Sequence, residues 1–333
     1  MPSIETILAG MMMISLTFYA LMGGADYGGG VWDLLAWGPR KKAQRELIAK
    51  AIGPIWEANH VWLILVIVIL FTAFPPAFAA ISTALHIPLV LMLSGIVLRG
   101  SAFIFRSYDK KTDAVQSGWG LIFSIASLMT PVLLGIMVGA LSSGTTQFKD
   151  DLLLSGFVNS WFALFPFAVG FFALTLFAFL AAVYLTVEAS AAELQDDFRW
   201  RAFIAGAFAG LMALIVYLLS ENGAPVIRHN LSASWWTWPL QIATATVALY
   251  TMIALWQRRF RLARFCAALQ VTLILWGWGN AQFPYLVVAD FTIYNSAAPP
   301  VALRLIFIAL TLGALLLFPS FYYLYRVFKS HEP

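Results

Sequence analysis

Apolar runs of about 20 residues recur along this 333-residue chain, and they restrict its fold more than any other feature. About 20 residues of helix, rising 1.5 Å each, cross a hydrocarbon core of roughly 30 Å. Backbone amides find no hydrogen-bond partner in hydrocarbon, so the runs must be helices rather than lipid-exposed strands. Only 11% of the residues are charged, against roughly a quarter in a soluble domain. The chain is therefore predicted to be an all-α, multi-pass membrane protein.

Nine membrane-spanning helices are predicted, and together they make a single transmembrane domain over residues 1–333. They are placed at 4–36, 54–72, 78–106, 117–141, 161–189, 199–220, 236–257, 262–284 and 301–328. Nine spans are compatible with two four-helix bundles and one extra helix. The segments between the spans are too short for a catalytic module, so any chemistry is expected at the membrane or in a partner.

The positive charges predict the orientation of the chain. Sixteen of the twenty Lys and Arg residues fall in alternate loops and in the C-terminal tail: Arg40, Lys41, Lys42, Arg45, Lys50, Arg106, Lys110, Lys111, Arg199, Arg201, Arg258, Arg259, Arg261, Arg264, Arg326 and Lys329. Cytoplasmic loops carry such an excess. The N-terminus is therefore expected outside and the C-terminus in the cytoplasm, and no nucleic-acid partner is expected. No basic residue precedes Arg40, so the first span is expected to be a retained helix rather than a signal peptide.

Three charged residues on consecutive spans are predicted to reach one level. Counting the helical rise from the predicted ends puts Asp26, Glu57 and Arg99 near the cytoplasmic edge, with His60 one turn deeper than Glu57. One interpretation is an entry point for protons or ions. The alternative is a set of interfacial charges that extend to water, or an Arg99–carboxylate pair that locks the helices together.

Small residues surround Asp26 in the stretch GGADYGGG. Gly24 and Gly28 have the spacing that lets two helix backbones approach closely, so they are predicted to pack this helix and to hold Asp26 against a neighbour. Asp33 lies beyond that level and is predicted to be a solvated interfacial charge.

Metal-ligand patterns are weak in this sequence. Cys266 is the single cysteine, which excludes an internal disulfide and a CxxC site. His60 and His86, the two histidines in predicted spans, would lie about 10 Å apart in depth, so they are poorly placed to bracket one haem. Glu57 and His60 have the spacing of half a di-metal carboxylate site, but the second half is missing. No metal site is predicted, and these residues alone fit either a cofactor-poor subunit or a small transporter.

The stretch GPIWEANHVWLI at 53–64 resembles subunit II of the cytochrome bd-type quinol oxidases, including the cyanide-insensitive branch. The other matching stretches are GGADYGGGVWDLL at 23–35, LFTAFPPAFA at 70–79, IPLVLMLSGIVLRGSAFIFR at 87–106 and AQFPYLVVADFTIYNSAAPP at 281–300. These stretches are spread along the chain in the expected order, and the similarity covers essentially its whole length. The combination is specific, whereas any single stretch would be weak.

The resemblance implies a subunit of a terminal oxidase that oxidises quinol, reduces dioxygen to water and generates a proton gradient. It implies that the haems, two of type b and one of type d, are held by subunit I, and that this chain ligates none of them. The expected partners are subunit I, quinol and membrane lipid, with room for a small single-helix subunit. The expected location is the bacterial cytoplasmic (inner) membrane.

The resemblance also implies roles for particular residues. Acidic residues at the positions of Asp26 and Glu57 are expected to serve a proton pathway from the cytoplasm. Asn59 and His60 would extend it, and Arg99 would be the charge partner of one carboxylate.

Two tryptophans flank this cluster in the sequence. Trp56 and Trp62 are expected to pack or to contact the other subunit, and Trp62 could instead line a path for dioxygen. Two other functions remain open at this point, namely a proton-coupled secondary transporter and a purely structural scaffold for subunit I.

Overall fold

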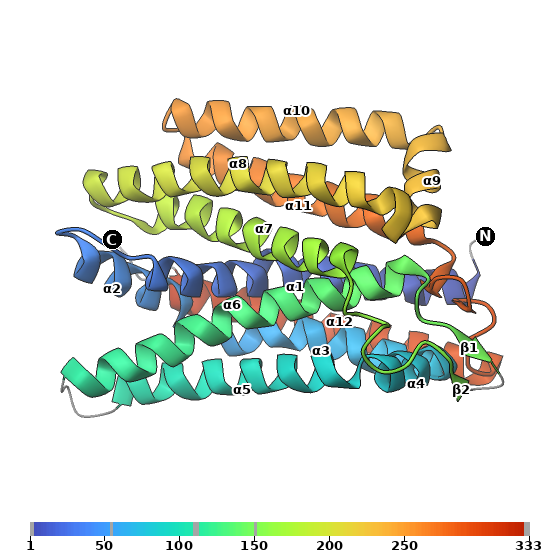
Figure 1. The fold of residues 1–333 in the computed structure, drawn as a ribbon. Helices are drawn as coiled ribbons and strands as arrows, with labels where there is room; N and C mark the ends of the chain where they lie inside the picture. Colours follow the sequence, from blue (N-terminus) through green and yellow to red (C-terminus); the bar gives the residue numbers. More distant parts are fainter. Residues whose placement is uncertain (1–2, 54–55, 109–112, 150–151, 330–333) are drawn as a thin grey trace.

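The computed structural model describes residues 3–53, 56–108, 113–149 and 152–329, and these residues are almost entirely helical (Figure 1). The helices are α1 Ile4–Leu34, α2 Lys41–Ile52, α3 Trp56–Ala73, α4 Pro75–Ala84, α5 His86–Tyr108, α6 Asp113–Ser143, α7 Leu164–Glu188, α8 Ala192–Gly223, α9 Pro225–Ala233, α10 Thr237–Trp256, α11 Phe260–Gln282 and α12 Pro300–Lys329. Two small antiparallel hairpins, β1 Phe148–Lys149 with β2 Leu152–Leu153 and β3 Tyr285–Val287 with β4 Phe291–Thr292, lie in the connections.

Nine of the described helices are long and apolar enough to cross a membrane, which confirms the predicted number of spans. They are α1, α3, α5, α6, α7, α8, α10, α11 and α12. The three remaining helices, α2, α4 and α9, have 12, 10 and 9 residues and are too short to cross.

The predicted third span, 78–106, is wrong in its first part. The chain forms α4 up to Ala84, leaves the helical conformation at Leu85 and starts α5 at His86. Pro88 supplies the physical reason, because its ring nitrogen has no hydrogen to donate to the Ala84 carbonyl and its ring would clash with that group. Apolar residues continue on both sides of the break, so hydrophobicity alone did not show it.

Two of the predicted loops also differ from the structure. The loop after the first span contains the basic helix α2, and α8 begins at Ala192, seven residues before the predicted start of its span. Arg201, which was counted among the loop charges, lies inside α8 and is only 7% exposed. Lys110 and Lys111, which contributed to the predicted orientation, lie outside the described residues.

The long helices run roughly parallel to one axis, and the N- and C-termini lie at opposite ends of it (Figure 1). One group contains α1, α3, α5 and α6, and the other contains α7, α8, α10 and α11. Helices α1, α6 and α7 pack on one another and join the two groups, while α12 lies against α3 and α1. The main core is built around α1 and α7, and α7 and α6 are the most buried of the nine long helices.

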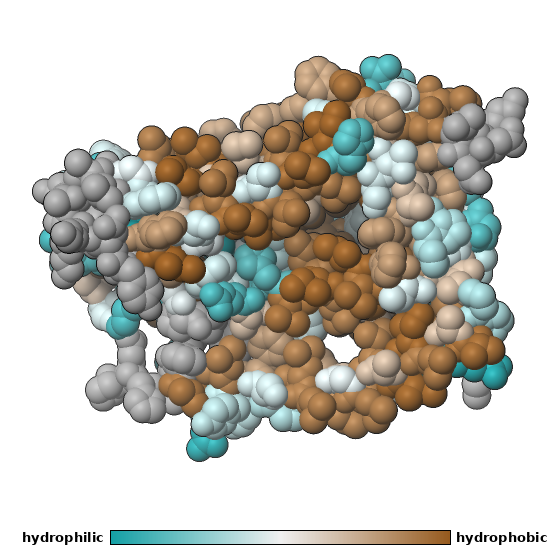
Figure 2. All heavy atoms as spheres, turned by 90° about the horizontal axis from the view of Figure 1, so that it is seen from below, coloured by the Kyte–Doolittle hydropathy of each residue, from teal (hydrophilic) through white to brown (hydrophobic). Residues whose placement is uncertain are grey.

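A broad apolar surface remains on the side formed by α3, α5 and α12. Large side chains exposed there include Ile64, Ile67, Phe71, Val90, Leu93, Val97, Leu305, Leu312 and Leu316. Figure 2 shows apolar side chains over much of this face. Exposed apolar area of this extent is expected of a chain surrounded by lipid and by other membrane helices.

Candidate functional site

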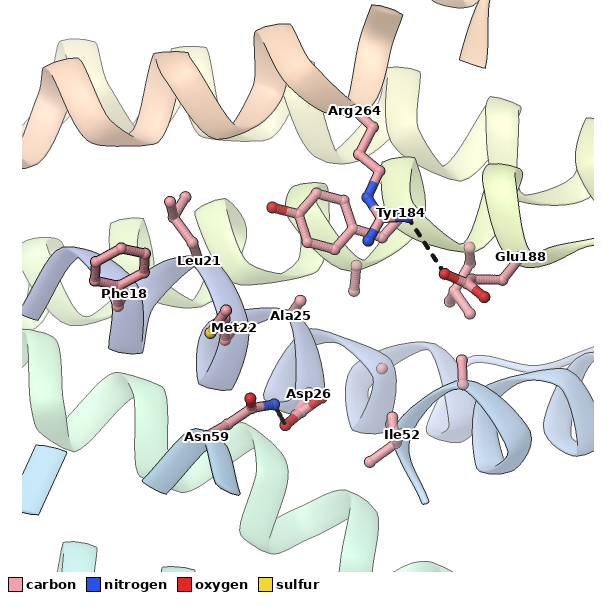
Figure 3. A pocket seen from close by; sticks show the side chains of 14 residues that line it. Phe18, Leu21, Met22, Ala25, Asp26, Ile52, Asn59, Tyr184, Glu188 and Arg264 are labelled. Atoms are coloured by element: carbon pink, nitrogen blue, oxygen red, sulfur yellow. Dashed lines mark hydrogen bonds and ion pairs between the residues drawn. The ribbon is translucent and has the colours of Figure 1, made fainter. Parts of the chain in front are cut away.

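The centre of the candidate site is a hydrogen bond between Asp26 of α1 and Asn59 of α3 (Figure 3). The Asn59 Nδ2 atom donates to Asp26 Oδ2 over 2.7 Å, and the two residues are 1% and 6% exposed respectively. An amide donor can bond a carboxyl group whether that group is charged or protonated. The pair therefore suits a carboxyl group that must exist in both states inside a membrane protein.

Two glycines of α1 explain how Asp26 is oriented. A Cβ atom at Gly28 would overlap the Phe177 carbonyl oxygen on α7, and one at Gly24 would come within 2.6 Å of the Phe177 ring. This side of α1 therefore packs directly on α7. Asp26 lies two residues from each glycine, which is about 200° around a helix of 3.6 residues per turn, so it faces away from Phe177 and toward α3.

A cavity of about 260 Å³ lies beside Asp26. Its lining comes from α1, α2, α3, α7 and α11 and consists of Phe18, Leu21, Met22, Ala25, Asp26, Gly29, Ala51, Ile52, Asn59, Ala181, Tyr184, Leu185, Glu188 and Arg264. Most of these side chains are apolar. Glu188 and Arg264 form an ion pair, with 3.3 Å between Oε1 and Nη1, on the side of the cavity away from Asn59 (Figure 3).

Helix α2 supplies one wall of this cavity and is held in place by side-chain hydrogen bonds to α8. Arg40 Nε and Gln44 Nε2 each donate to Asp197 Oδ2 over 2.8 Å. Arg201 Nη2 in turn donates to Gln44 Oε1 over 2.7 Å. The hydrogen bond to Asp197 raises the pKa of Arg40 above its ordinary value. These contacts fix α2 so that Ala51 and Ile52 reach the cavity.

Glu57 does not join Asp26 in this arrangement. It lies in the first turn of α3 and is exposed, whereas Asn59 is buried against Asp26. Residues two apart on a helix point to nearly opposite sides. The sequence therefore predicted correctly that Glu57 lies at the start of α3. It did not predict that the Glu57 side chain faces outward, away from Asp26.

His60 is surrounded by aromatic rings rather than by polar partners. Its ring centroid lies 6.0 Å from that of Tyr19, 6.1 Å from that of Tyr27 and 6.1 Å from that of Trp56. The Tyr19 and Tyr27 hydroxyl groups are buried and 3.2 Å apart, one donating to the other. Neither tyrosine was predicted from the sequence to belong to the site, although two phenols eight residues apart on a predicted span are a recognisable signal.

Arg99 of α5 is 2% exposed, which is unusual for a charged residue. Its Nε donates to Ser127 Oγ over 3.1 Å. Its guanidinium carbon lies 4.7 Å from the Tyr27 ring centroid and 5.2 Å from that of Phe123. Within the described part of the chain, its Nη2 atom has no hydrogen-bond acceptor. The guanidinium is therefore held mainly by aromatic faces rather than by the carboxylate predicted as its partner.

Asp33 is the clearest correction to the sequence analysis. It was predicted to be solvated, yet it is 1% exposed. Arg106 Nη1 donates to Oδ1 over 3.1 Å, Ser124 Oγ donates to Oδ2 over 3.3 Å, and Arg45 Nε lies 3.8 Å from Oδ2. One carboxylate thus connects α1 to α2, α5 and α6. Depth counting could not find this, because the partners come from three other helices.

The two tryptophans differ in how they are packed. Trp62 is 3% exposed and stacks on Phe18 of α1 at 4.5 Å and on Phe321 of α12 at 5.3 Å between ring centroids. Its own chain covers it, so it is not available for the expected contact with another subunit. Trp56 is only half-buried and packs on His60 and Phe103.

A sequence model of the family described as cytochrome bd terminal oxidase subunit II matches residues 4–328 of this chain. The chain belongs to this family. Cytochrome bd ubiquinol oxidase subunit 2 of Bacillus subtilis (strain 168) is 25% identical over 355 residues, which cover 98% of this chain and 96% of that protein. Cytochrome bd-I ubiquinol oxidase subunit 2 of Escherichia coli (strain K12) is 26% identical over 220 residues, covering 64% of this chain and 54% of that protein.

The fold of this chain also occurs in a solved structure. The bd oxidase from Geobacillus thermodenitrificans contains a chain that matches with a TM-score of 0.84 at 22% identity, covering 99% of this chain and 100% of that one. Among the described residues of the present chain, no group of three or more His, Cys, Asp and Glu is close enough to hold a metal ion. His86 lies apart from the Asp26 site, with its ring on Phe157 and its Nδ1 3.0 Å from the Thr83 carbonyl oxygen.

Proposed function

We propose that this chain is the non-haem-ligating subunit of a quinol oxidase that transfers electrons from quinol to dioxygen and forms water in the bacterial cytoplasmic membrane. Family membership supports this proposal. Its partner is subunit I, which carries two haems b and one haem d, and a small single-helix subunit can complete the complex. Quinol is the substrate of the assembly. Membrane lipid covers the apolar surface that the partners leave free.

The proposal assigns the chain a second task, which is to admit protons from the cytoplasmic side. Water formation consumes protons, and taking them from the inside generates a proton gradient. The observation that carries this assignment is a buried carboxyl group, Asp26, at the wall of a cavity and hydrogen-bonded to Asn59. An ionisable residue inside the membrane is costly, so it is kept mainly where it transfers or binds ions.

Glu57 and His60 extend the proposed route toward subunit I. Glu57 is exposed on α3 and lies seven residues, or about two turns, before the exposed Ile64. Both side chains are therefore on the same side of the helix, and a second subunit packed on the apolar face would cover Glu57. Asn59 follows Glu57 by two residues on α3 and donates a hydrogen bond to Asp26. Arg99 supplies a positive charge close to Tyr27. This charge repels a further positive charge, such as an additional proton, in the same region.

The experiment replaces Asp26 by Asn in the assembled oxidase, which keeps the size of the side chain and removes its exchangeable acid proton. We expect oxygen consumption to fall by about tenfold or more while the haem spectrum stays normal, since a positioned proton-transfer group contributes roughly 10²–10⁴-fold. Glu57→Gln should have an effect of the same kind. Asp290→Asn, in the connection before α12, is the matched control and should leave turnover unchanged.

A wild-type rate in a fully assembled Asp26→Asn complex would refute the proton role and leave the chain as a scaffold for subunit I. A purified chain that carries no haem-bearing partner would contradict the oxidase assignment and favour a transporter.

A further inference from the structure

The cavity beside Asp26 has charged groups on two opposite sides and apolar side chains between them (Figure 3). Asp26 and Asn59 lie on one side, and Glu188 and Arg264 lie on the other. Glu188 is the last residue of α7, and Ala181, which also lines the cavity, lies seven residues before it. At 1.5 Å per residue these positions are about 10 Å apart, so the cavity follows α7 inward from its end for about two turns.

The Glu188–Arg264 pair is partly open to solvent. The two side chains are 26% and 39% exposed, and the Arg264 guanidinium carbon lies 4.9 Å from the centroid of the Tyr184 ring. Tyr184 also lines the cavity. The carboxylate therefore contacts both the outside water and the interior space. An ion pair this exposed adds little to stability, so it can break and form again during function.

The size of the cavity suits a short water chain. A volume of about 260 Å³ holds about eight waters at roughly 30 Å³ each. Water needs polar partners in order to occupy a buried space, and here both ends supply them. A proton taken up by Glu188 can then pass along hydrogen-bonded water to the Asp26 carboxyl group.

We infer that Glu188 is the entry carboxylate for protons that travel to Asp26, that Arg264 holds it at the mouth, and that the cavity is the water-filled path between them. This inference rests on the proposed function. The alternative is that Glu188 and Arg264 form a purely structural ion pair between α7 and α11. The two roles differ because only an entry group must bind and release a proton. The Arg258–Asp196 pair, with 2.8 Å between Nη2 and Oδ2, offers the comparison, since neither residue lines this cavity.

The first experiment measures oxygen consumption by the assembled oxidase carrying Glu188→Gln. We expect turnover to fall by about fivefold or more, which is below the roughly 10²–10⁴-fold contribution of a positioned proton-transfer group because water can partly bypass the mouth. The rate ratio between H₂O and D₂O should rise, and Glu188→Asp should restore most of the rate. Asp196→Asn weakens the ion pairs of Asp196 with Arg199 and Arg258, which lie outside the cavity lining, and should change neither quantity.

The second experiment detects water in the cavity without relying on turnover. Cys266 is the single cysteine of this chain, so Cys266→Ala gives a chain without thiols, and labelling is read on this chain. Ala25→Cys places a thiol on the cavity wall, and Ala20→Cys places one on the same helix but in the packed core, where Ala20 is 4% exposed. A small charged methanethiosulfonate reagent should label the assembled complex with Ala25→Cys and spare the one with Ala20→Cys.

The outcomes separate this inference from the proposed function. If Asp26→Asn slows the oxidase while Glu188→Gln turns over normally, or while Ala25→Cys resists labelling, the inference is wrong and the proton role of Asp26 stands. If Asp26→Asn is also normal, both fail. If Glu188→Asp is as slow as Glu188→Gln without a change in the isotope ratio, the pair is structural and the inference is again overturned.

Discussion

Replacing Gly28 by Ala should separate α1 from α7 and destabilise the protein. The added Cβ would overlap the Phe177 carbonyl oxygen and would lie 2.7 Å from the Ala181 Cβ. Ordinary van der Waals contact begins at 3.4 Å, so the helices would have to move apart by roughly 1 Å. The obstacle is backbone, which cannot rotate out of the way as a side chain can.

The size of the effect follows from this geometry. Overpacking a well-packed core by one methyl group costs about 1–3 kcal/mol, and the upper part of this range applies where backbone must shift. Alanine is a better helix former than glycine by about 1 kcal/mol, which offsets part of the cost. We therefore expect a net destabilisation of about 1–2 kcal/mol. Gly24→Ala should cost less, because its obstacle is the ring of Phe177.

The assay measures the thermal midpoint of unfolding of the purified complex. It also measures the fraction of this chain that is recovered in the assembled complex. Gly10→Ala is the matched control, since it lies on the same helix and has nothing within 4 Å of the added atom. We expect Gly10→Ala to match or exceed the wild type. Equal midpoints for Gly28→Ala and Gly10→Ala would show that α1 and α7 are not in direct backbone contact at Gly28.

Two further substitutions test single contacts. Asp33→Asn should lower stability by about 2 kcal/mol, less than the roughly 3–5 kcal/mol of a fully buried pair, because the Arg106 side chain keeps 22% exposure. A thermal midpoint no lower than that of Asp196→Asn, whose own side chain keeps 35% exposure, would contradict this. Trp32→Phe removes the 2.8 Å hydrogen bond from Nε1 to the Ala178 carbonyl oxygen and should lower stability by about 1 kcal/mol. Trp235→Phe, at a residue 85% exposed, is the control and should leave the thermal midpoint unchanged. A similar loss in both variants would refute the role of the bond.

The number of spans was predictable because hydrophobic length is a local property of the sequence. The run preceding α5 was misread, since it stays apolar through the break at Leu85 and only the position of Pro88 marks the change. The orientation of the termini remains a prediction from loop charges. The packing of α1 on α7 was partly foreseeable, because Gly24 and Gly28 share one side of a helix.

The site was less predictable than the fold, because its contacts join residues far apart in the sequence. Depth counting placed Asp26 near the start of α3, and the structure shows its bond to Asn59. In the sequence, Arg264 was counted only as a charge that sets the orientation, and Glu188 was not considered. The two residues are 76 positions apart and pair only because α7 and α11 pack together. Which side of α3 a residue faces also depends on tertiary packing, which explains the outward position of Glu57.

The buried Asp33 carboxylate has a consequence for how the chain is made. Its partner Arg106 is 73 residues further along, and a ribosome adding 5–20 residues per second needs about 4–15 s to reach it. During that interval the first helix enters the bilayer with an acid at its edge that has no matching base from α5. The contact that joins α1 to α5 through Asp33 can therefore form only after the third long helix has been made.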